Sequence, residues 1–459
     1  MLLKFSEFRG ILYADDAFLD ETAERAGSVL REMKKRPEQN TGQDERLELQ
    51  MQVSEKARWT DCLTIILLGA ILFGFGIGIY VREPDVFSEQ ENRYLTQLPS
   101  ASSAYSGDFF GRVREGKLLD RLIAGDFTAE MADFYADQLP FRNAFVGLKG
   151  ICEIASLKQE NDGAVLGRDG YLIKRCDYAD CGMMLKNLDS MIAFAQAMEA
   201  DGIPCTLAVA GRTADVMRDK LPALFPWYRT RTVWEALEAR VAETGVSYLP
   251  LCDRLTALNE KGAAHPLYYR TDHHWTSWGA YYAYAALCEE LGVEPLAESD
   301  LTEQAASDSF YGTTWSSAGL KWIAPDTMLF LRYEGDTGYT TCISDSGKRF
   351  SGFYDESCLE KKDKYSAFIG GNNALVYVTK DGAEEDRGRL LLIKDSFAHS
   401  MAPFLAYHWD LVIVDTRYYK QSVRALAKAE GVERVLILAN MGGMTEANVY
   451  GVLTFGLDE

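Results

Sequence analysis

Residues 62–81, CLTIILLGAILFGFGIGIYV, are twenty consecutive residues without a charged side chain. A helix rises about 1.5 Å per residue, so this segment is long enough to cross the hydrocarbon core of a bilayer. A buried core helix of this length normally has a polar face. A cleaved signal peptide begins nearer residue 1 and has a shorter apolar region. The segment therefore predicts one transmembrane anchor, which separates residues 1–61 from residues 84–459.

The basic residues beside the anchor favour an N-terminus in the cytoplasm. Three precede it and two follow it: Arg46, Lys56 and Arg58, then Arg82 and Arg93. We therefore expect residues 1–61 to be a cytoplasmic tail, with a helix that stops at Pro37 and a linker from Glu38 to Glu55. Residues 84–459 are expected to form an extracytoplasmic domain.

Charge and cysteine content exclude some classes of function. The formal net charge of −20 argues against nucleic-acid binding, which needs clustered Lys and Arg. The nine cysteines include no CxxC pair that would indicate a zinc site. Cys176 and Cys181 are close enough in sequence to form a disulfide, although buried free thiols are the commoner state.

Strand and helix patterns alternate from about residue 183 onward. PCTLAVA, VSYLPL, RLLLIKD, DLVIVD and RVLILAN are apolar runs typical of buried strands, and amphipathic segments separate them. This alternation predicts an α/β domain with a parallel sheet covered by helices on both faces. Residues 296–388 are less regular and are expected to form a β-rich insertion. Before this region, AVLGRDGYLI predicts a hairpin with Gly170 in its turn.

The stretch TDHHWT, residues 271–276, contains two of the five histidines of the chain. It precedes a helical segment that Gly292 ends and that Thr276 or Ser277 can cap. In an extended backbone, Asp272 and His274 point to one side and His273 points to the other. An acid beside an imidazole fixes its tautomer and supports its charged form, as a general base requires.

A nucleophile for this base is found in RLLLIKDSFAHS. The apolar run ends at Lys394, so Ser396 lies in a strand-to-helix turn at the open end of the sheet. Backbone N–H groups at the start of the helix can stabilise an oxyanion there. An ordinary helix cap is the simpler interpretation of such a serine, but the Asp-x-His pair elsewhere in the chain favours catalysis.

Together, TDHHWT and the downstream KDSF resemble the DHHW protein family, which is related to the alginate O-acetyltransferases of the SGNH hydrolase superfamily. FSEQENRYLTQLP, DQLPFR, FYGT, GGNN and DTRYY also resemble it, so the resemblance covers about residues 84–459. It implies an SGNH-hydrolase-like α/β fold behind one N-terminal transmembrane helix. A Ser–His–Asp triad is also implied, and the matching positions are Ser396, His274 and Asp272.

The resemblance implies further site residues. Arg417 and Tyr418 of DTRYY would line the site, and the oxyanion donors would include asparagines, for which Asn372 and Asn440 are the candidates. Two positions depart from the SGNH pattern: Lys394 replaces the glycine of Gly-Asp-Ser, and Arg212 stands where a Pro-x-Lys lysine is expected.

Three functions fit these residues. An extracytoplasmic O-acetyltransferase would pass an acetyl group through Ser396 to a polysaccharide hydroxyl, and an esterase of the same fold would pass it to water. A metal-dependent hydrolase would use Asp-x-His as ligands, but few other histidines are placed to join them. A non-catalytic glycan-binding protein would keep the fold, and Lys394 is the feature that most favours it.

The acyl donor is the remaining question for a transferase. The sequence has no glycine-rich phosphate loop and no basic cleft for coenzyme A, so no cofactor is expected. Resemblance to the alginate system implies a separate membrane-bound O-acyltransferase that supplies acetyl groups from across the bilayer. The single anchor would hold the domain near this partner and raise its effective concentration.

Overall fold

The computed structural model describes Ser28 and residues 41–88, 93–98, 126–175, 181–223, 225–382 and 387–457. The chain forms two compact units, Met1–Glu83 and Pro84–Glu459. Cys176 and the helix predicted before Pro37 lie outside the described residues.

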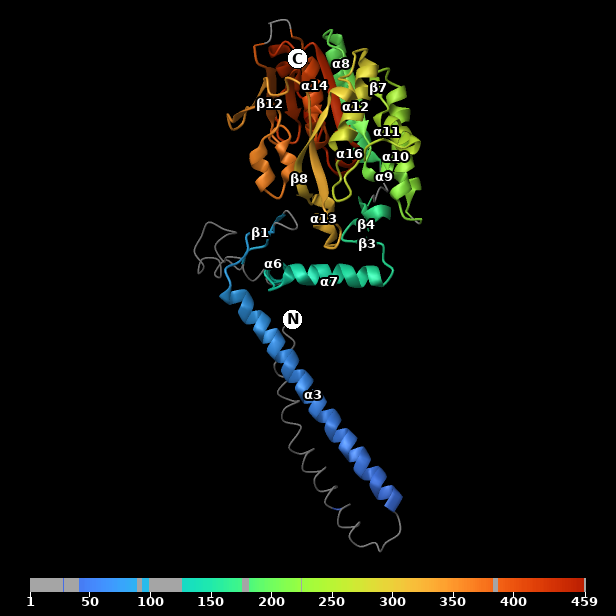
Figure 1. The fold of residues 1–459 in the computed structure, drawn as a ribbon, viewed down its shortest axis with the longest axis vertical. Helices are drawn as coiled ribbons and strands as arrows, with labels where there is room; N and C mark the ends of the chain where they lie inside the picture. The colour runs from blue at the N-terminus through green and yellow to red at the C-terminus, as the bar shows by residue number, and fades with distance from the viewer. Residues whose placement is uncertain are drawn as a thin grey trace. The chain divides into compact units, whose positions relative to one another are not determined.

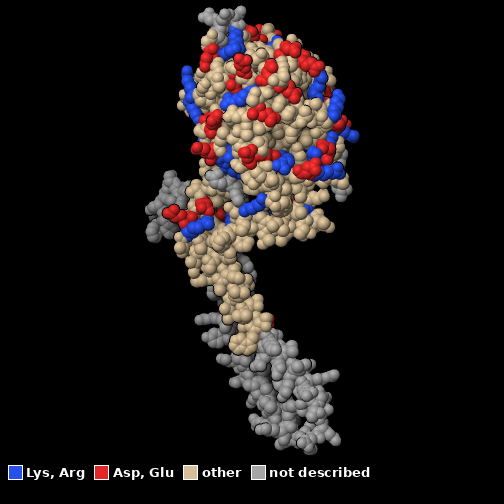
Figure 2. Space-filling model, viewed as in Figure 1, with Lys and Arg blue, Asp and Glu red and all other residues tan. Residues whose placement is uncertain are grey.

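The first unit contains one long helix, α3 (Thr41–Val81). Within it, Trp59–Val81 is long and apolar enough to cross a membrane by length and composition, with a mean hydropathy of 2.5. Figure 2 shows the described part of this helix almost entirely without charged side chains. The linker predicted from Glu38 to Glu55 is wrong from Thr41 onward, because the Glu, Gln, Arg and Leu residues of this stretch are good helix formers and extend a helix that is already nucleated.

The second unit is built on an eight-stranded sheet with the order β11-β10-β12-β14-β13-β15-β6-β7. Five neighbouring strands are parallel, as the sequence predicts: β14 (Asp410–Asp415), β13 (Arg389–Lys394), β15 (Arg434–Asn440), β6 (Cys205–Ala210) and β7 (Ser247–Leu249). The side chains of β13 and β15 are almost all buried, as expected for strands covered on both faces. The predicted α/β fold is confirmed.

The β-rich insertion enlarges this sheet. Its strands β10 (Tyr339–Ile343), β11 (Arg349–Ser351) and β12 (Leu375–Lys380) join antiparallel, with β12 beside β14. They cover an edge of the parallel sheet that would otherwise be open to pairing with other chains. Strands β8 (Thr302–Phe310) and β9 (Asp326–Arg332) form a separate antiparallel pair.

Helices cover the faces of the sheet (Figure 1). Those with eight or more residues are α8 (Gly182–Ala200), α10 (Trp227–Ala242), α11 (Leu251–Lys261) and α12 (Ser277–Leu291). Shorter ones follow strand ends: α9 (Thr213–Val216), α13 (Thr313–Ala318), α14 (Ala402–His408), α15 (Val423–Ala429) and α16 (Met441–Glu446). The short helices α9 and α16 matter for the site, because they begin just after the parallel strands β6 and β15 end.

The N-terminal part of this unit contains short strands and two helices, α6 (Asp126–Asp137) and α7 (Arg142–Ala155). Strands β1 (Phe87–Ser88) and β2 (Arg93–Tyr94) form one antiparallel pair, and β3 (Glu160–Asn161), β4 (Ala164–Leu166) and β5 (Leu172–Lys174) form a three-stranded sheet. The hairpin predicted from AVLGRDGYLI is the β4–β5 pair, and Gly170 adopts a positive φ of 77° in its turn.

Candidate active site

Asp272 and His274 lie in the loop between α11 and α12, and both are buried. Thr276 caps α12 by accepting a hydrogen bond from the backbone N–H of Gly279 at 3.0 Å, one of the two caps that the sequence predicts. Asp272 Oδ1 lies 2.5 Å from His274 Nδ1 and also accepts the backbone N–H of His274 at 2.9 Å. The alternation of side chains therefore places the acid and the imidazole together, as predicted.

Ser396 completes a hydrogen-bonded series with this pair. Its Oγ lies 2.7 Å from His274 Nε2, so the imidazole contacts the carboxylate through one nitrogen and the hydroxyl through the other. Burial alone raises the pKa of Asp272, but the imidazoles of His273 and His274 and the hydrogen bonds from His274 hold that pKa well below its usual range. Asp272 is therefore ionised and can stabilise a positive charge on His274.

The turn that carries Ser396 is held by the preceding acid. Asp395 Oδ1 accepts the N–H of Phe397 at 2.9 Å, and its Oδ2 accepts the N–H of Asn440, at the end of β15, at 2.6 Å. The serine opens a short 3₁₀ helix, Ser396–His399, and α14 begins only at Ala402. The single helix predicted here is interrupted because Pro403 has no N–H to continue a helix from the preceding turn.

Residues of the FYGT stretch hold Asp272 from the other side. The backbone N–H and the hydroxyl of Thr313 donate to Asp272 Oδ2 at 2.6 and 3.1 Å. Gly312 packs directly against Asp272, and a Cβ at this position would collide with the Asp272 side chain. FYGT is a weak motif in the sequence, but its Gly312 and Thr313 hold Asp272 in position.

Trp275 and Tyr365 pack around His274. The indole Nε1 of Trp275 donates to the backbone oxygen of Phe397 at 2.9 Å and contacts Ser400 Oγ at 3.0 Å. The Tyr365 ring stacks on His274, with centroids 4.1 Å apart, and its hydroxyl lies 2.9 Å from Ser400 Oγ. Both aromatic residues therefore connect the histidine loop to the turn of Ser396. Tyr365 carried no motif signal, because it lies between the FYGT and GGNN stretches and belongs to neither.

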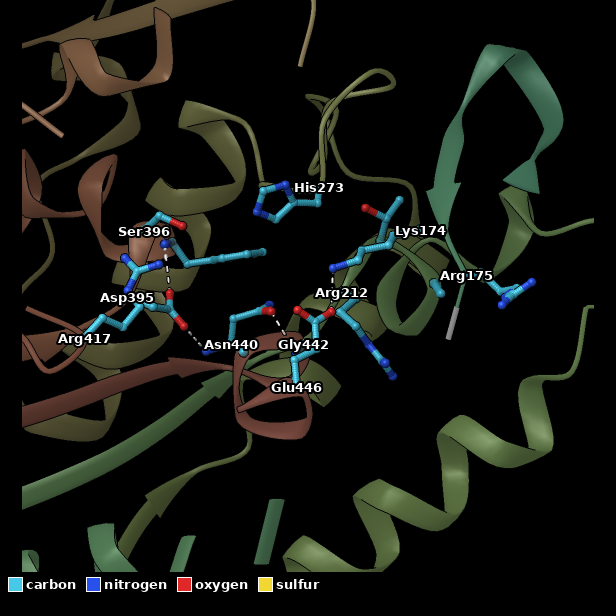
Figure 3. Close-up of a pocket in the computed structure, with 14 residues that line it drawn as sticks. Lys174, Arg175, Arg212, His273, Asp395, Ser396, Arg417, Asn440, Gly442 and Glu446 are labelled. Atoms are coloured by element: carbon cyan, nitrogen blue, oxygen red, sulfur yellow. Dashed lines mark hydrogen bonds and ion pairs between the residues drawn. The ribbon is translucent and has the colours of Figure 1, made fainter. Parts of the chain in front are cut away.

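His273 does not point away from the site, so that prediction is wrong. Its ring lies beside that of His274, with centroids 3.9 Å apart, and it lines the same cavity as Ser396 (Figure 3). His273 Nδ1 lies 2.7 Å from the hydroxyl of Thr313, which pulls the ring toward α13. Burial and the neighbouring His274 lower the pKa of His273 to about 3, so its imidazole is neutral at pH 7.

Ser396 opens into a cavity of about 170 Å³ at the ends of the parallel strands. Arg417 and Asn440, two of the candidates from the sequence, line it together with Arg212 (Figure 3). Tyr418 is not among the lining residues, and its side chain is 51% exposed. Asn372 is not among them either, but its Oδ1 accepts a hydrogen bond from Arg417 at 2.8 Å. The amide oxygen of Asn440 accepts the N–H of Gly442 at 2.8 Å.

Two arginines in the cavity wall are held by carboxylates. Arg212 binds Asp215 through Nε and one terminal nitrogen at 2.8 and 2.9 Å. Arg417 binds Asp415 in the same manner at 2.9 and 2.6 Å. Burial alone lowers the pKa of Arg417, but the pairing with Asp415 raises it above its ordinary value. Both guanidinium groups are therefore fixed in the wall of the cavity that Ser396 lines, each as one half of an ion pair.

Lys394, the departure from the SGNH glycine, does not enter the cavity. Its side chain is fully buried, and its Nζ lies 3.0 Å from Asp415 Oδ2 and 2.6 Å from His399 Nε2. Burial lowers the pKa of Lys394. The lysine therefore supports the acid that holds Arg417 and leaves Ser396 accessible.

Asp272, His273 and His274 are also spaced closely enough to hold a metal ion, with one ligand atom of each within 4.8 Å of the others. Both ring nitrogens of His274 already contact Asp272 and Ser396. At 2.5 Å, the Nδ1–Oδ1 contact is a hydrogen bond and is too short to hold an ion between the two atoms. The geometry therefore suits proton transfer better than metal binding.

Comparison with known families agrees with this arrangement. Residues 256–415 match the sequence profile of the DHHW protein family, and residues 165–330 match that of an SGNH hydrolase-like domain, acetyltransferase AlgX. The resemblance to the DHHW family is confirmed. A probable alginate O-acetylase, AlgJ, from Pseudomonas syringae pv. tomato is 22% identical over 199 residues. The match covers 42% of this chain and 50% of AlgJ, so it spans half the length of that relative.

Solved structures share the fold. A DHHW family protein from Eubacterium siraeum has a TM-score of 0.53 at 20% identity, covering 64% of this chain and 96% of that one. Bacillus cereus PatB1, solved with a sulfonyl adduct, has a TM-score of 0.51 at 16% identity, covering 62% of this chain and 96% of its own. At these identities, the likeness is one of fold.

The Gly312→Ala substitution tests whether the position of Asp272 controls the reactivity of Ser396. A serine activated by an imidazole attacks sulfonyl fluorides, and displacement of Asp272 by the new methyl group should slow labelling on the order of 100-fold. Intact-mass spectrometry measures the labelling rate. Gly338→Ala is the control, because a Cβ there meets only Gly335 O at 3.3 Å. Equal rates for Gly312→Ala and wild type would contradict this role.

Proposed function

We propose that this protein is an acyl-transfer enzyme, an O-acetyltransferase that uses Ser396, His274 and Asp272 as its triad. The observation that carries the proposal is the unbroken hydrogen-bonded series from Asp272 through His274 to Ser396, at 2.5 and 2.7 Å. The fold and the sequence similarity to the acetyltransferases AlgX and AlgJ support the same class of reaction.

The proposed reaction has two steps. Ser396 Oγ bonds to the acyl carbon of a donor ester as His274 Nε2 takes the hydroxyl proton, and the donor alkoxide leaves with that proton. A glycan hydroxyl then attacks the acyl carbon of the acyl-serine and loses its proton to His274, the bond between that carbon and Ser396 Oγ breaks, and His274 returns the proton to Ser396. Asp272 stays ionised throughout and stabilises the imidazolium. Arg212 and Arg417 in the cavity wall stabilise negative charge on the tetrahedral intermediates.

The acceptor in this proposal is a cell-surface or secreted polysaccharide. Support comes from the alginate acetylase among the relatives and from the candidate span Trp59–Val81. The span would anchor the chain in the cell membrane, with residues 1–61 as a cytoplasmic tail and 84–459 as the extracytoplasmic domain. In this proposal the acetyl groups come from a membrane-bound O-acyltransferase, because the sequence has no glycine-rich phosphate loop for coenzyme A.

Substitution of the triad tests the chemistry. Ser396→Ala, His274→Ala and Asp272→Asn should each reduce hydrolysis of a chromogenic acetyl ester on the order of 10⁴-fold, because members of such a unit fail together. His273→Ala is the matched control and should be far milder, because the Nδ1 of His273 contacts Thr313 rather than Ser396. Equal losses at residues 273 and 274 would show that the base is wrongly assigned.

Protease treatment of intact spheroplasts tests the orientation. We expect the protease to digest residues 84–459 and to spare a tag fused to the N-terminus, because the basic residues before the span favour the cytoplasmic side. Immunoblots of both ends measure the result. Detergent-permeabilised cells are the control, in which both ends should be digested. A spared domain and a digested tag would place Ser396 in the cytoplasm and exclude a surface acceptor.

Deletion of the gene for the donor acyltransferase distinguishes transfer from hydrolysis. If the donor acyltransferase passes its acetyl group to Ser396, the loss of the donor should abolish glycan acetylation as completely as Ser396→Ala does, because both changes interrupt one path. The acetate content of the purified glycan measures this. If acetylation persists without the donor, the proposed transfer from this donor to Ser396 is wrong. If acetylation rises when Ser396 is replaced, the enzyme is an esterase.

A further inference from the structure

Helix α7 has an unusual distribution of side chains for a helix of a soluble domain. Its buried positions are Gly147 and Gly150. Large apolar side chains lie on its outer face instead, and 43–54% of each is exposed: Phe145, Leu148 and Ile151. These positions are three residues apart and share one helical face. The helix therefore packs on the protein through Gly147, Gly150 and the partly buried Ile154, and leaves three large apolar residues exposed.

The inward glycines are needed for close packing. A Cβ on Gly150 would lie 2.9 Å from Leu320 Cδ2, and one on Gly147 would lie 3.3 Å from Lys321 Cδ. The inner face of α7 therefore lies against the chain near residue 320 with little space between them. The exposed apolar residues are not the face by which α7 packs on the core, because the face with Gly147 and Gly150 makes that contact.

The apolar surface extends beyond the outer face of α7. Phe141, at the N-cap, is 75% exposed, and Leu157, just after the helix, is 91% exposed. Trp322 is 49% exposed and follows Lys321, which packs on α7. We call these three residues and the outer face of α7 the α7 surface. Figure 2 shows few charged side chains on this part of the domain. Such a surface marks a binding site for a protein or a membrane.

Hydrogen bonds tie the start of α7 to the chain that leaves the candidate span. Asp85 is four residues after Val81, the last residue of the span. Its N–H donates to Gln138 Oε1 at 2.9 Å, and Gln138 Nε2 donates to the Asp85 oxygen at 2.9 Å. Gln138 precedes Phe141 by three residues. Arg93 and Asp137 strengthen this junction with two hydrogen bonds, at 3.0 and 2.5 Å. The start of the α7 surface is therefore connected to the span by a short path through Asp85 and Gln138.

We propose that the α7 surface lies in the interfacial layer of the lipid bilayer that α3 crosses. Phe141, Phe145, Leu148 and Ile151 would lie among the upper acyl chains, and Trp322 would lie at the headgroup level that tryptophan prefers. The lipid bilayer is the favoured occupant because the tether keeps this surface close to the membrane. The proposal rests on the proposed anchoring through α3 but not on the proposed chemistry.

Membrane contact at this place would orient the active site. The chain near residue 320, which packs on α7, directly follows α13. Within α13, the backbone N–H of Trp315 donates to the oxygen of Thr271 at 2.9 Å, and Thr271 precedes Asp272. On the other side, β5 ends at Lys174, which lines the cavity of Ser396. With α7 in the bilayer surface, the cavity would stay at a fixed height above the membrane.

Photo-crosslinking of the full chain in phosphatidylcholine nanodiscs tests the proposal. We would place p-benzoylphenylalanine at residue 145, at residue 407 as a control and at residue 72 within the span. Phe145 and Tyr407 are matched, because each is 43% exposed. Mass spectrometry should find lipid adducts at 72 and 145 and none above background at 407. Because the contact is apolar, the yield at 145 should not fall between 0.05 and 0.5 M salt.

Each result is decisive. No lipid adduct at 72 would overturn the anchoring on which the proposal rests. An adduct at 72 without one at 145 would overturn the α7 proposal alone, as would a protein adduct at 145 or equal yields at 145 and 407.

A substitution provides a second readout. Leu148→Glu with Ile151→Glu should reduce the adduct at 145 on the order of tenfold, because charges are costly among acyl chains. Lys186→Glu on α8 changes the net charge by the same amount and should leave the yield unchanged. Ester hydrolysis should be normal in both variants and shows that they fold. An unchanged adduct in the double variant would contradict the proposal.

Discussion

The hydrogen bond from the Trp275 indole to the backbone of Phe397 connects the two parts of the candidate active site. Residues 275 and 397 are 122 positions apart, and each directly follows a catalytic candidate, Trp275 in a loop and Phe397 in a short 3₁₀ helix. The indole is fully buried, so the loss of this bond would leave a polar group without a partner in the core. With it, the His274 loop and the Ser396 turn have one relative position, and the 2.7 Å contact between imidazole and hydroxyl follows.

Local patterns in the sequence predict the parts of the site that depend on local geometry. The alternation of side chains places Asp272 beside His274, and the end of the apolar run puts Ser396 in a turn at the end of β13. The same patterns give the five parallel strands. The motif TDHHWT thus combines the proposed acid and base with the indole that contacts the turn of Ser396.

The parts that could not be predicted depend on contacts between distant residues. Thr313 holds both Asp272 and His273 from 41 and 40 positions away, and this contact turns His273 into the cavity against its expected direction. The insertion seemed irregular because its strands β10 and β11 are short, and only β12 joins the parallel part of the sheet, through β14, which lies beyond the insertion. The contact of Lys394 with Asp415 could not be predicted for the same reason, since the two residues become neighbours only when β13 and β14 pair.

A transferase of this design must compete with water. Water can reach any acyl-serine that a large glycan can reach, so selectivity depends on how often an acceptor hydroxyl occupies the cavity before hydrolysis occurs. Binding of the acceptor in the right orientation raises its effective concentration at the acyl carbon far above that in solution. The proposed anchoring would act on the other half of the reaction, because it would keep Ser396 near a donor in the same membrane. A domain held only by a flexible linker would meet the donor in many orientations. Contact between α7 and the bilayer would restrict these orientations, and the tether and the helix would together favour transfer over hydrolysis.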